Sequence, residues 1–214
     1  MSLDERLGRT VGRPLFWVIF LGVIFALPIV RSVRARLPPP LPVLGTIGNF
    51  VLTDERGEPF GSAQLRGWVW VADFVFTRCP TECPLLTERM GKVQHRARNL
   101  GNAFQLVSFS VDPEWDTPAR LQIYARTHRA SPRMWAFLTG PYQVIRKTVI
   151  EEMKVGIGRG GSSGPVADVG SIFHDSHVVL VDAGMRVRGY YDVSSDDGID
   201  TLMRDIGMLV ARGE

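Results

Sequence analysis

Cysteine is scarce in this chain of 214 residues, which has only two, and histidine is scarce too, with four. The two cysteines, Cys79 and Cys83, lie four positions apart. A closed structural zinc site usually takes four protein ligands, and thiolates supply several of them. The lack of a third cysteine therefore argues against a structural zinc site.

A basic surface is also lacking over most of the chain, although the net charge is +3 and the pI is about 9.1. Six arginines fall within the first 36 residues, against Asp4 and Glu5. From residue 37 onward, 19 basic residues face 20 acidic ones. A nearly neutral domain has no electrostatic footprint for nucleic acid, so we expect no nucleic-acid partner.

Charge is missing altogether from residues 14–30, a strongly apolar run with arginines on both sides. Its 17 residues are at the short end for a membrane span, but flanking arginines can extend towards the interface. No small-x-small cleavage site follows it. We therefore predict an uncleaved transmembrane anchor over residues 14–30, preceded by a tail over residues 1–13. Equal numbers of arginines on the two sides leave the orientation open.

A proline-rich segment, L-P-P-P-L-P at 37–42, follows the anchor and is typical of a stiff spacer. Residues 31–42 are thus predicted to be an Arg/Pro-rich linker, and residues 43–214 a single globular domain. Apolar residues make up 45% of the chain, enough for a substantial core.

Within that domain, predicted strands and helices alternate. Strands are expected at 48–53, 68–76, 104–111 and 134–138, a hairpin at 177–182 and 185–191, and helices at 85–100, 116–128, 142–153 and 196–211. The strand at 68–76 is apolar on both faces, as in the centre of a sheet. Such an order predicts an α/β sandwich with a mixed central sheet.

The cysteines stand where the central strand gives way to a helix, in the run F-T-R-C-P-T-E-C-P at 76–84. Residues i and i+4 are neighbours on a helix, so a C-x3-C pair there places both sulfurs on one face of the first turn. Two such thiols can hold a thiophilic metal, act as a redox pair, or form a structural disulfide.

Ligand preference, loop length and thiolate stability distinguish these three alternatives only in part. Two thiolates and one imidazole suit copper(I), which prefers soft sulfur and accepts three ligands; copper(II) could be held if water or a carboxylate joined. A structural disulfide is disfavoured because it would close a very short loop. A redox pair remains open, because a helix N-terminus and Arg78 favour the thiolate while Glu82 opposes it.

Four signatures in order make the chain resemble the Sco/SenC family. They are L-P-V-L-G at 41–45 with F-x-L-T-D at 50–54, the C-x3-C run at 76–84, S-V-D-P-E-W-D-T-P at 110–118, and W-x-F-L-T-G at 135–140. The resemblance implies a thioredoxin-like fold anchored in the inner (cytoplasmic) membrane by one helix, with the domain on the periplasmic or extracytoplasmic side. It further implies a copper chaperone whose partner is the copper-containing subunit of cytochrome c oxidase.

The resemblance also implies a histidine ligand. His174, eight residues before Asp182, matches the family position, although Phe173 stands where the family often has aspartate. His177 is the reserve candidate. Residues three apart in an extended chain point to opposite faces, so one of the two is expected to face the cysteines. His95 and His128 lie among arginines on predicted helices and are expected to face solvent.

Two functions remain open on these residues. One is a metallochaperone that binds copper through Cys79, Cys83 and His174. The other is a thiol–disulfide reductase in which Cys79 and Cys83 form the catalytic redox pair and keep the cysteines of the oxidase reduced. Only the first needs a histidine.

Overall fold

A computed structural model describes residues 14–34, 39–79, 82–155 and 177–214. The chain divides into two compact units, Met1–Pro40 and Leu41–Glu214. In the first unit, a 21-residue helix, α2, covers Pro14–Arg34. Across the described ranges, no helix combines the length and apolar character that crossing a membrane requires. The predicted anchor at 14–30 is thus not confirmed.

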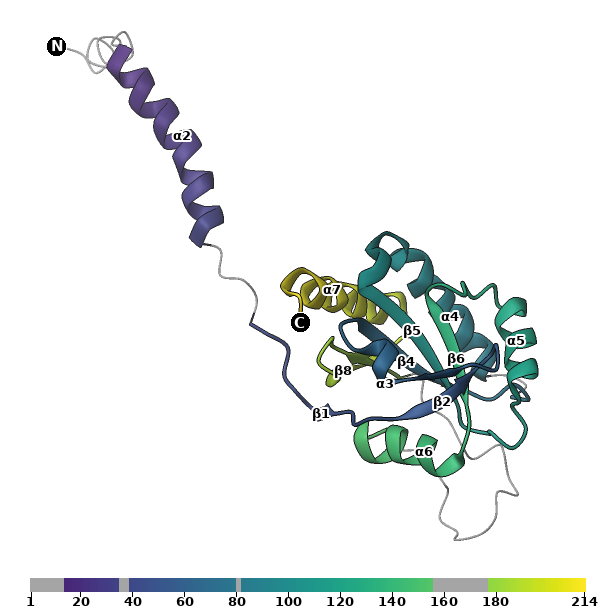
Figure 1. Cartoon of the computed structure of the whole chain (residues 1–214). Coiled ribbons are helices and arrows are strands. Elements are labelled where there is room, and N and C mark those ends of the chain that lie inside the picture. The colour runs from purple at the N-terminus through teal and green to yellow at the C-terminus, as the bar shows by residue number, and fades with distance from the viewer. Residues whose placement is uncertain (1–13, 35–38, 80–81, 156–176) are drawn as a thin grey trace, which may run out of the picture. The chain divides into compact units, whose positions relative to one another are not determined.

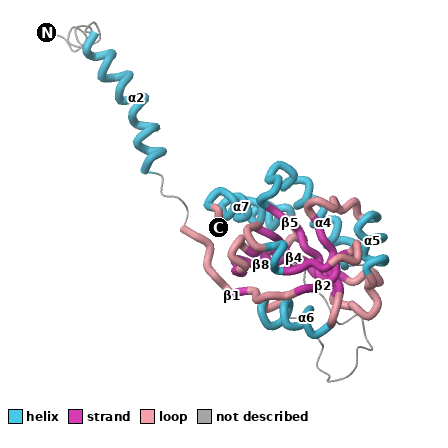
Figure 2. Tube along the Cα trace, viewed as in Figure 1, coloured by secondary structure: helices cyan, strands magenta, loops and turns pink. Residues whose placement is uncertain are grey.

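The second unit is built on one mixed eight-stranded sheet, in the order β1-β8-β7-β4-β5-β6-β2-β3 (Figures 1 and 2). Strands β4, β5 and β6 run parallel to one another, and the remaining pairs are antiparallel. The strands are β1 (Gly45–Thr46), β2 (Val51–Asp54), β3 (Pro59–Gly61), β4 (Val69–Val75), β5 (Phe104–Ser110), β6 (Trp135–Thr139), β7 (His177–Val181) and β8 (Arg186–Asp192). The predicted mixed α/β fold is confirmed.

The helices cover both faces of this sheet (Figure 1). One face packs against α4 (Glu82–Ala97), α5 (Pro118–Thr127) and α7 (Asp196–Arg212). The other packs against the short α3 (Ser62–Leu65), α6 (Tyr142–Arg146) and the π-helical turn η2 (Lys147–Glu152). A 3-10 segment, η1 (Arg98–Ala103), joins α4 to β5.

Helix α4, which carries Cys83, is held by its apolar stripe. Leu86, Met90, Val93 and Ala97 recur at helical spacing and are all buried against the sheet. Strand β4 is buried at every position, as its two-sided apolar pattern predicts. The junction between β4 and α4 is therefore fixed at both ends by well-packed elements.

Three short elements were missed from the sequence, and two helices differ from their predictions. β1, β3 and α3 together cover only nine residues, too few for a periodic signal. The helix predicted at 142–153 divides into α6 and η2. The helix predicted at 85–100 begins earlier, at Glu82, so Cys83 lies within its first turn.

Candidate metal and thiol site

The carboxyl ends of the parallel strands form the edge of the sheet that carries the candidate site. The loop after β4 contains Cys79, and the loop after β5 contains Asp112 and Asp116. Because β4 and β5 are parallel neighbours, both loops leave the sheet at the same edge. The two loops are joined there by hydrogen bonds and an ion pair.

Asp116 ties the two loops together from a fully buried position. Its carboxylate accepts the Thr77 hydroxyl at 2.5 Å, the Thr77 amide at 3.2 Å and the Ser110 hydroxyl at 2.6 Å. Burial raises the pKa of Asp116, against the hydrogen bonds from Ser110 and Thr77, which lower it. The sequence indicated only a helix start here. Thr117 is the residue that caps α5, and Asp116 holds the cysteine loop instead.

Asp112 has two structural roles at this edge of the sheet. Its carbonyl oxygen accepts the amides of Trp115 and Asp116, which closes a turn. Its carboxylate forms an ion pair with Arg78 at 2.6 Å. Arg78 directly precedes Cys79, so this pair is a second tie between the loops.

Cys79 and Cys83 are neighbours, but Cys79 lies in the loop before α4 rather than in its first turn, where the sequence placed it, and the surroundings of the two cysteines differ. Cys83 lies in the first turn of α4 and is 3% exposed, whereas Cys79 is half-buried. The Cys83 amide donates a hydrogen bond to the Cys79 sulfur at 3.3 Å. A backbone N–H at a helix N-terminus stabilises negative charge on a sulfur. Burial raises the pKa of the Cys83 thiol, and the charges of Cys79 and Asp73 raise it further.

A buried polar cluster underlies this corner of the molecule. Asp73, in the middle of β4, is fully buried and accepts the Ser108 hydroxyl at 2.6 Å, while Trp135 donates its indole N–H to Ser108 at 2.8 Å. The second carboxylate oxygen of Asp73 has no hydrogen-bond partner among the described residues. Burial raises the pKa of Asp73 to about 7. Sequence analysis did not select Asp73, although a carboxylate within an apolar strand was a visible signal.

Only one of the two candidate histidines lies among the described residues. His174 lies outside the described residues. His177 begins β7, is half-buried and pairs with Asp192 across the hairpin. Strand alternation puts it on the face of Val179 and Val181, which belong to the core cluster that contains Cys83 and against which Cys79 packs. Because β7 is antiparallel to β4, His177 also lies towards the end of the sheet where the cysteine loop begins.

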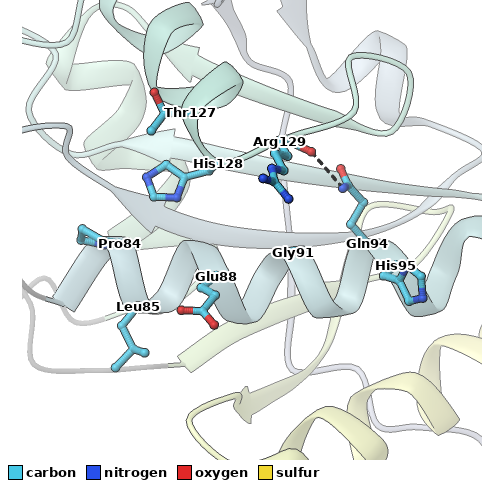
Figure 3. A pocket seen from close by; sticks show the side chains of 9 residues that line it. All are labelled: Pro84, Leu85, Glu88, Gly91, Gln94, His95, Thr127, His128 and Arg129. Atoms are coloured by element: carbon cyan, nitrogen blue, oxygen red, sulfur yellow. Dashed lines mark hydrogen bonds between the residues drawn. The ribbon is translucent and has the colours of Figure 1, made fainter.

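The other two histidines are not both solvent-facing. His95 is exposed and contacts Arg98 at 2.9 Å, as expected for a surface residue. His128 is half-buried against the Tyr124 ring, with 4.4 Å between ring centroids, and burial lowers its pKa. The expectation for His128 was wrong because α5 ends against α4 rather than in open solvent. Both histidines line a groove of about 700 Å³ that runs along α4 from Pro84 (Figure 3).

The predicted donor set for a thiophilic metal consists of the two thiols and a histidine. Within the described ranges, no group of three His, Cys, Asp or Glu side chains is arranged to hold a metal ion. The predicted set of Cys79, Cys83 and His174 includes a residue beyond those ranges. The two sulfurs on adjoining backbone at a helix start fit a soft ion such as copper(I).

This arrangement, a mixed α/β domain with a dithiol at a strand-to-helix junction, defines a class of thioredoxin-like proteins. The SCO1/SenC family model matches residues 42–211, and the chain belongs to that family. A SCO1 protein homolog of Bacillus subtilis is 31% identical over 157 residues, covering 73% of this chain and 79% of the relative.

Solved structures of the family agree with this assignment. BsSco, described as a member of the Sco family of cytochrome c oxidase assembly proteins with a disulfide switch, has a TM-score of 0.68 at 27% identity and covers 80% of this chain and 98% of its own. Bradyrhizobium japonicum ScoI with copper bound has a TM-score of 0.59 at 25% identity, covering 74% and 98%. The chain thus has the thioredoxin-like fold of the Sco proteins.

Proposed function

We propose that this protein is a membrane-anchored copper chaperone that binds copper(I) through Cys79, Cys83 and a histidine. It delivers the ion to the copper-containing subunit of cytochrome c oxidase. The observation that carries the proposal is the Cys79–Cys83 pair at the start of α4, where a backbone amide is directed at the Cys79 sulfur. The copper-bound relative and the relative named for oxidase assembly support the choice of cargo and recipient.

Copper binding at such a site requires both cysteine thiols to lose their protons, and the two thiols are not equivalent. The half-buried Cys79 sulfur accepts an N–H and is the first contact for an incoming soft ion. Cys83 is buried with a raised pKa, so its thiol keeps its proton until the cation arrives to replace it. Copper affinity should therefore increase with pH, because each bound thiolate requires release of a proton.

A thiol–disulfide reductase is the second candidate, and the same asymmetry favours it. A half-buried sulfur that accepts a helix-start amide suits the attacking thiolate, and a buried thiol with a raised pKa suits the resolving one. In that reaction Cys79 attacks a partner disulfide and forms a mixed disulfide. Cys83 then loses its proton, attacks the Cys79 sulfur and releases the partner as a dithiol.

Copper(I) titration of the full chain, purified reduced and in neutral detergent against a competing chelator, tests the proposal. Cys79→Ser and Cys83→Ser should each abolish high-affinity binding, because one thiolate and one imidazole hold a soft ion poorly. Circular dichroism should show that both variants remain folded. If the Cys83→Ser chain binds copper(I) as tightly as the parent, the site lies elsewhere.

The histidine variants separate the two functions. The family register favours His174, and His174→Ala should weaken copper binding while leaving the Cys79–Cys83 redox couple intact. His177→Ala should change neither, and the reverse pattern would overturn the assignment of His174 as the ligand. His95→Ala is the matched control on the exposed face of α4. Copper binding unaffected by either His174→Ala or His177→Ala would favour the reductase.

A further inference from the structure

Beside the cysteine loop, two arginines contact the ring of an exposed tryptophan. The Arg78 guanidinium carbon lies 5.2 Å from the centroid of the Trp115 ring, and that of Arg120 lies 3.9 Å from it. Trp115 is 41% exposed, and the Arg78 side chain is 40% exposed. We call these three residues the Arg–Trp cluster.

The backbone beneath the cluster is held in place. The Trp115 amide donates to Asp112, and the Trp115 carbonyl oxygen accepts both the Thr117 amide at 3.0 Å and the Arg120 guanidinium at 2.6 Å. The Arg78 Nε is bonded to Asp112. Side chains fixed in this way lose little further conformational entropy when they bind a partner.

The cluster is also rigidly connected to the candidate site. Arg78 adjoins Cys79 in the chain. Asp116 adjoins Trp115 and accepts a hydrogen bond from the Thr77 hydroxyl. A molecule that contacts Trp115 and Arg78 is therefore held next to the more exposed of the two sulfurs. A partner protein that docks here would bring its own thiols close to Cys79.

The chemistry of the cluster defines its ligand. Tryptophan and arginine are the residues that most often dominate the energy of protein interfaces. A guanidinium binds a carboxylate through paired N–H donors. Arg78 is already paired with Asp112, whereas Arg120 forms no ion pair with a described residue, although the exposed Glu114 adjoins Trp115. A partner that fits would present a carboxylate beside an apolar side chain.

We infer that the Arg–Trp cluster is the docking site for an acidic and apolar segment of the protein that exchanges copper or electrons with Cys79 and Cys83. The inference rests on the proposed function, since it assigns the partner surface for that site. The ligand is a protein segment rather than a lipid headgroup, because an exposed tryptophan in contact with two guanidinium groups offers apolar ring area as well as charge.

Direct binding tests the inference without requiring copper or thiol exchange. The probe is the purified copper-containing domain of the oxidase of the same organism, with serines in place of its copper-ligating cysteines. The full chain in neutral detergent should bind it, and added salt should weaken the complex. Trp115→Ala and Arg120→Gln should each raise the dissociation constant about tenfold. Trp115→Phe should recover part of the loss.

Matched controls come from α5, the helix that carries Arg120. Arg126→Gln removes an equal charge, and Ile123→Ala removes an apolar side chain that is 66% exposed; neither should change binding. Copper(I) affinity should be unchanged in Trp115→Ala, which separates this inference from the proposed function. Equal binding by Trp115→Ala and the parent, or no binding by the parent, would overturn it. The inference would also be overturned if Arg120→Gln weakened binding only to vesicles of phosphatidylcholine and phosphatidylglycerol and left binding of the oxidase domain unchanged.

Discussion

At the scale of single residues, the chemistry at this site depends on a difference between two identical side chains. Cys79 is half-buried and accepts an N–H, and Cys83 is buried with a raised pKa. The sequence predicts that the two sulfurs are close, because four residues make one helical turn. It does not predict which is buried, since that depends on the sheet packed beneath α4.

Asp73 offers a second residue-scale test, through the pH dependence of stability. Its pKa is about 7 in the folded protein against 3.8 ordinarily, so the unfolded chain releases this proton first as pH rises. The carboxyl group therefore contributes stability that is fully present below about pH 4 and lost by about pH 7 to 8. Asp73→Asn should remove this loss. Between pH 4 and pH 8, the variant should therefore lose roughly 2–4 kcal/mol less stability than the parent.

Urea unfolding midpoints measured between pH 4 and pH 8 check this prediction. The Asn side chain keeps an oxygen that can accept the Ser108 hydroxyl, so the variant should fold. Asp197→Asn, at an exposed position on α7, is the matched control and should leave the slope of the parent unchanged. A parent whose stability is flat across this range would contradict a buried, neutral Asp73.

At the scale of elements, two loops that are distant in the sequence form one site because β4 and β5 are parallel neighbours. Thr77 and Asp116 are 39 positions apart, and the hydrogen bonds between them are partly buried. An isolated motif does not reveal such a contact. The order of the strands is needed to place both motifs at one edge of the sheet.

Asp116→Asn should loosen the cysteine loop. The amide group retains one oxygen but presents N–H donors where Thr77 and Ser110 also donate, so at least one buried donor loses its partner. We expect a loss of about 1–3 kcal/mol of stability, together with faster hydrogen exchange at the Thr77 amide. Asp112→Asn, which removes only the partly exposed pair with Arg78, should cost no more than about 1 kcal/mol. Unchanged exchange in the loop would show that Asp116 does not hold it.

Periodic elements were predictable from the sequence, and contacts between elements were not. The strand predicted at 68–76 corresponds to β4 at Val69–Val75, and the helix predicted from residue 85 begins at Glu82. The earlier start places Cys83 inside the first turn. For the two candidate histidines, the sequence predicted only that they point to opposite faces; which face of β7 lies over the cysteines follows from the packing of the core.

At the scale of the whole molecule, the proposed membrane location of this protein depends on the apolar run at 14–30. The run has no charged residue and lies between two groups of arginines. Equal charge on the two sides does not set its orientation, so the proposed extracytoplasmic location of the domain rests on family resemblance. A chaperone for an oxidase copper site needs its cysteines on the side of the membrane where that site is assembled.

A reporter fused after Glu214 tests this location. An alkaline phosphatase fusion, which needs an oxidising compartment to form its disulfides, should be active, and a fluorescent fusion that matures only in the cytoplasm should be dark. Deleting residues 1–30 should reverse both signals, because the domain would then remain in the cytoplasm. Replacing three apolar residues within 14–30 by arginine should have the same effect, since each charge near a bilayer centre costs about 2.5–3.5 kcal/mol. A bright cytoplasmic fusion of the parent chain would contradict the proposed location, because copper delivery to an extracytoplasmic site requires Cys79 and Cys83 on that side.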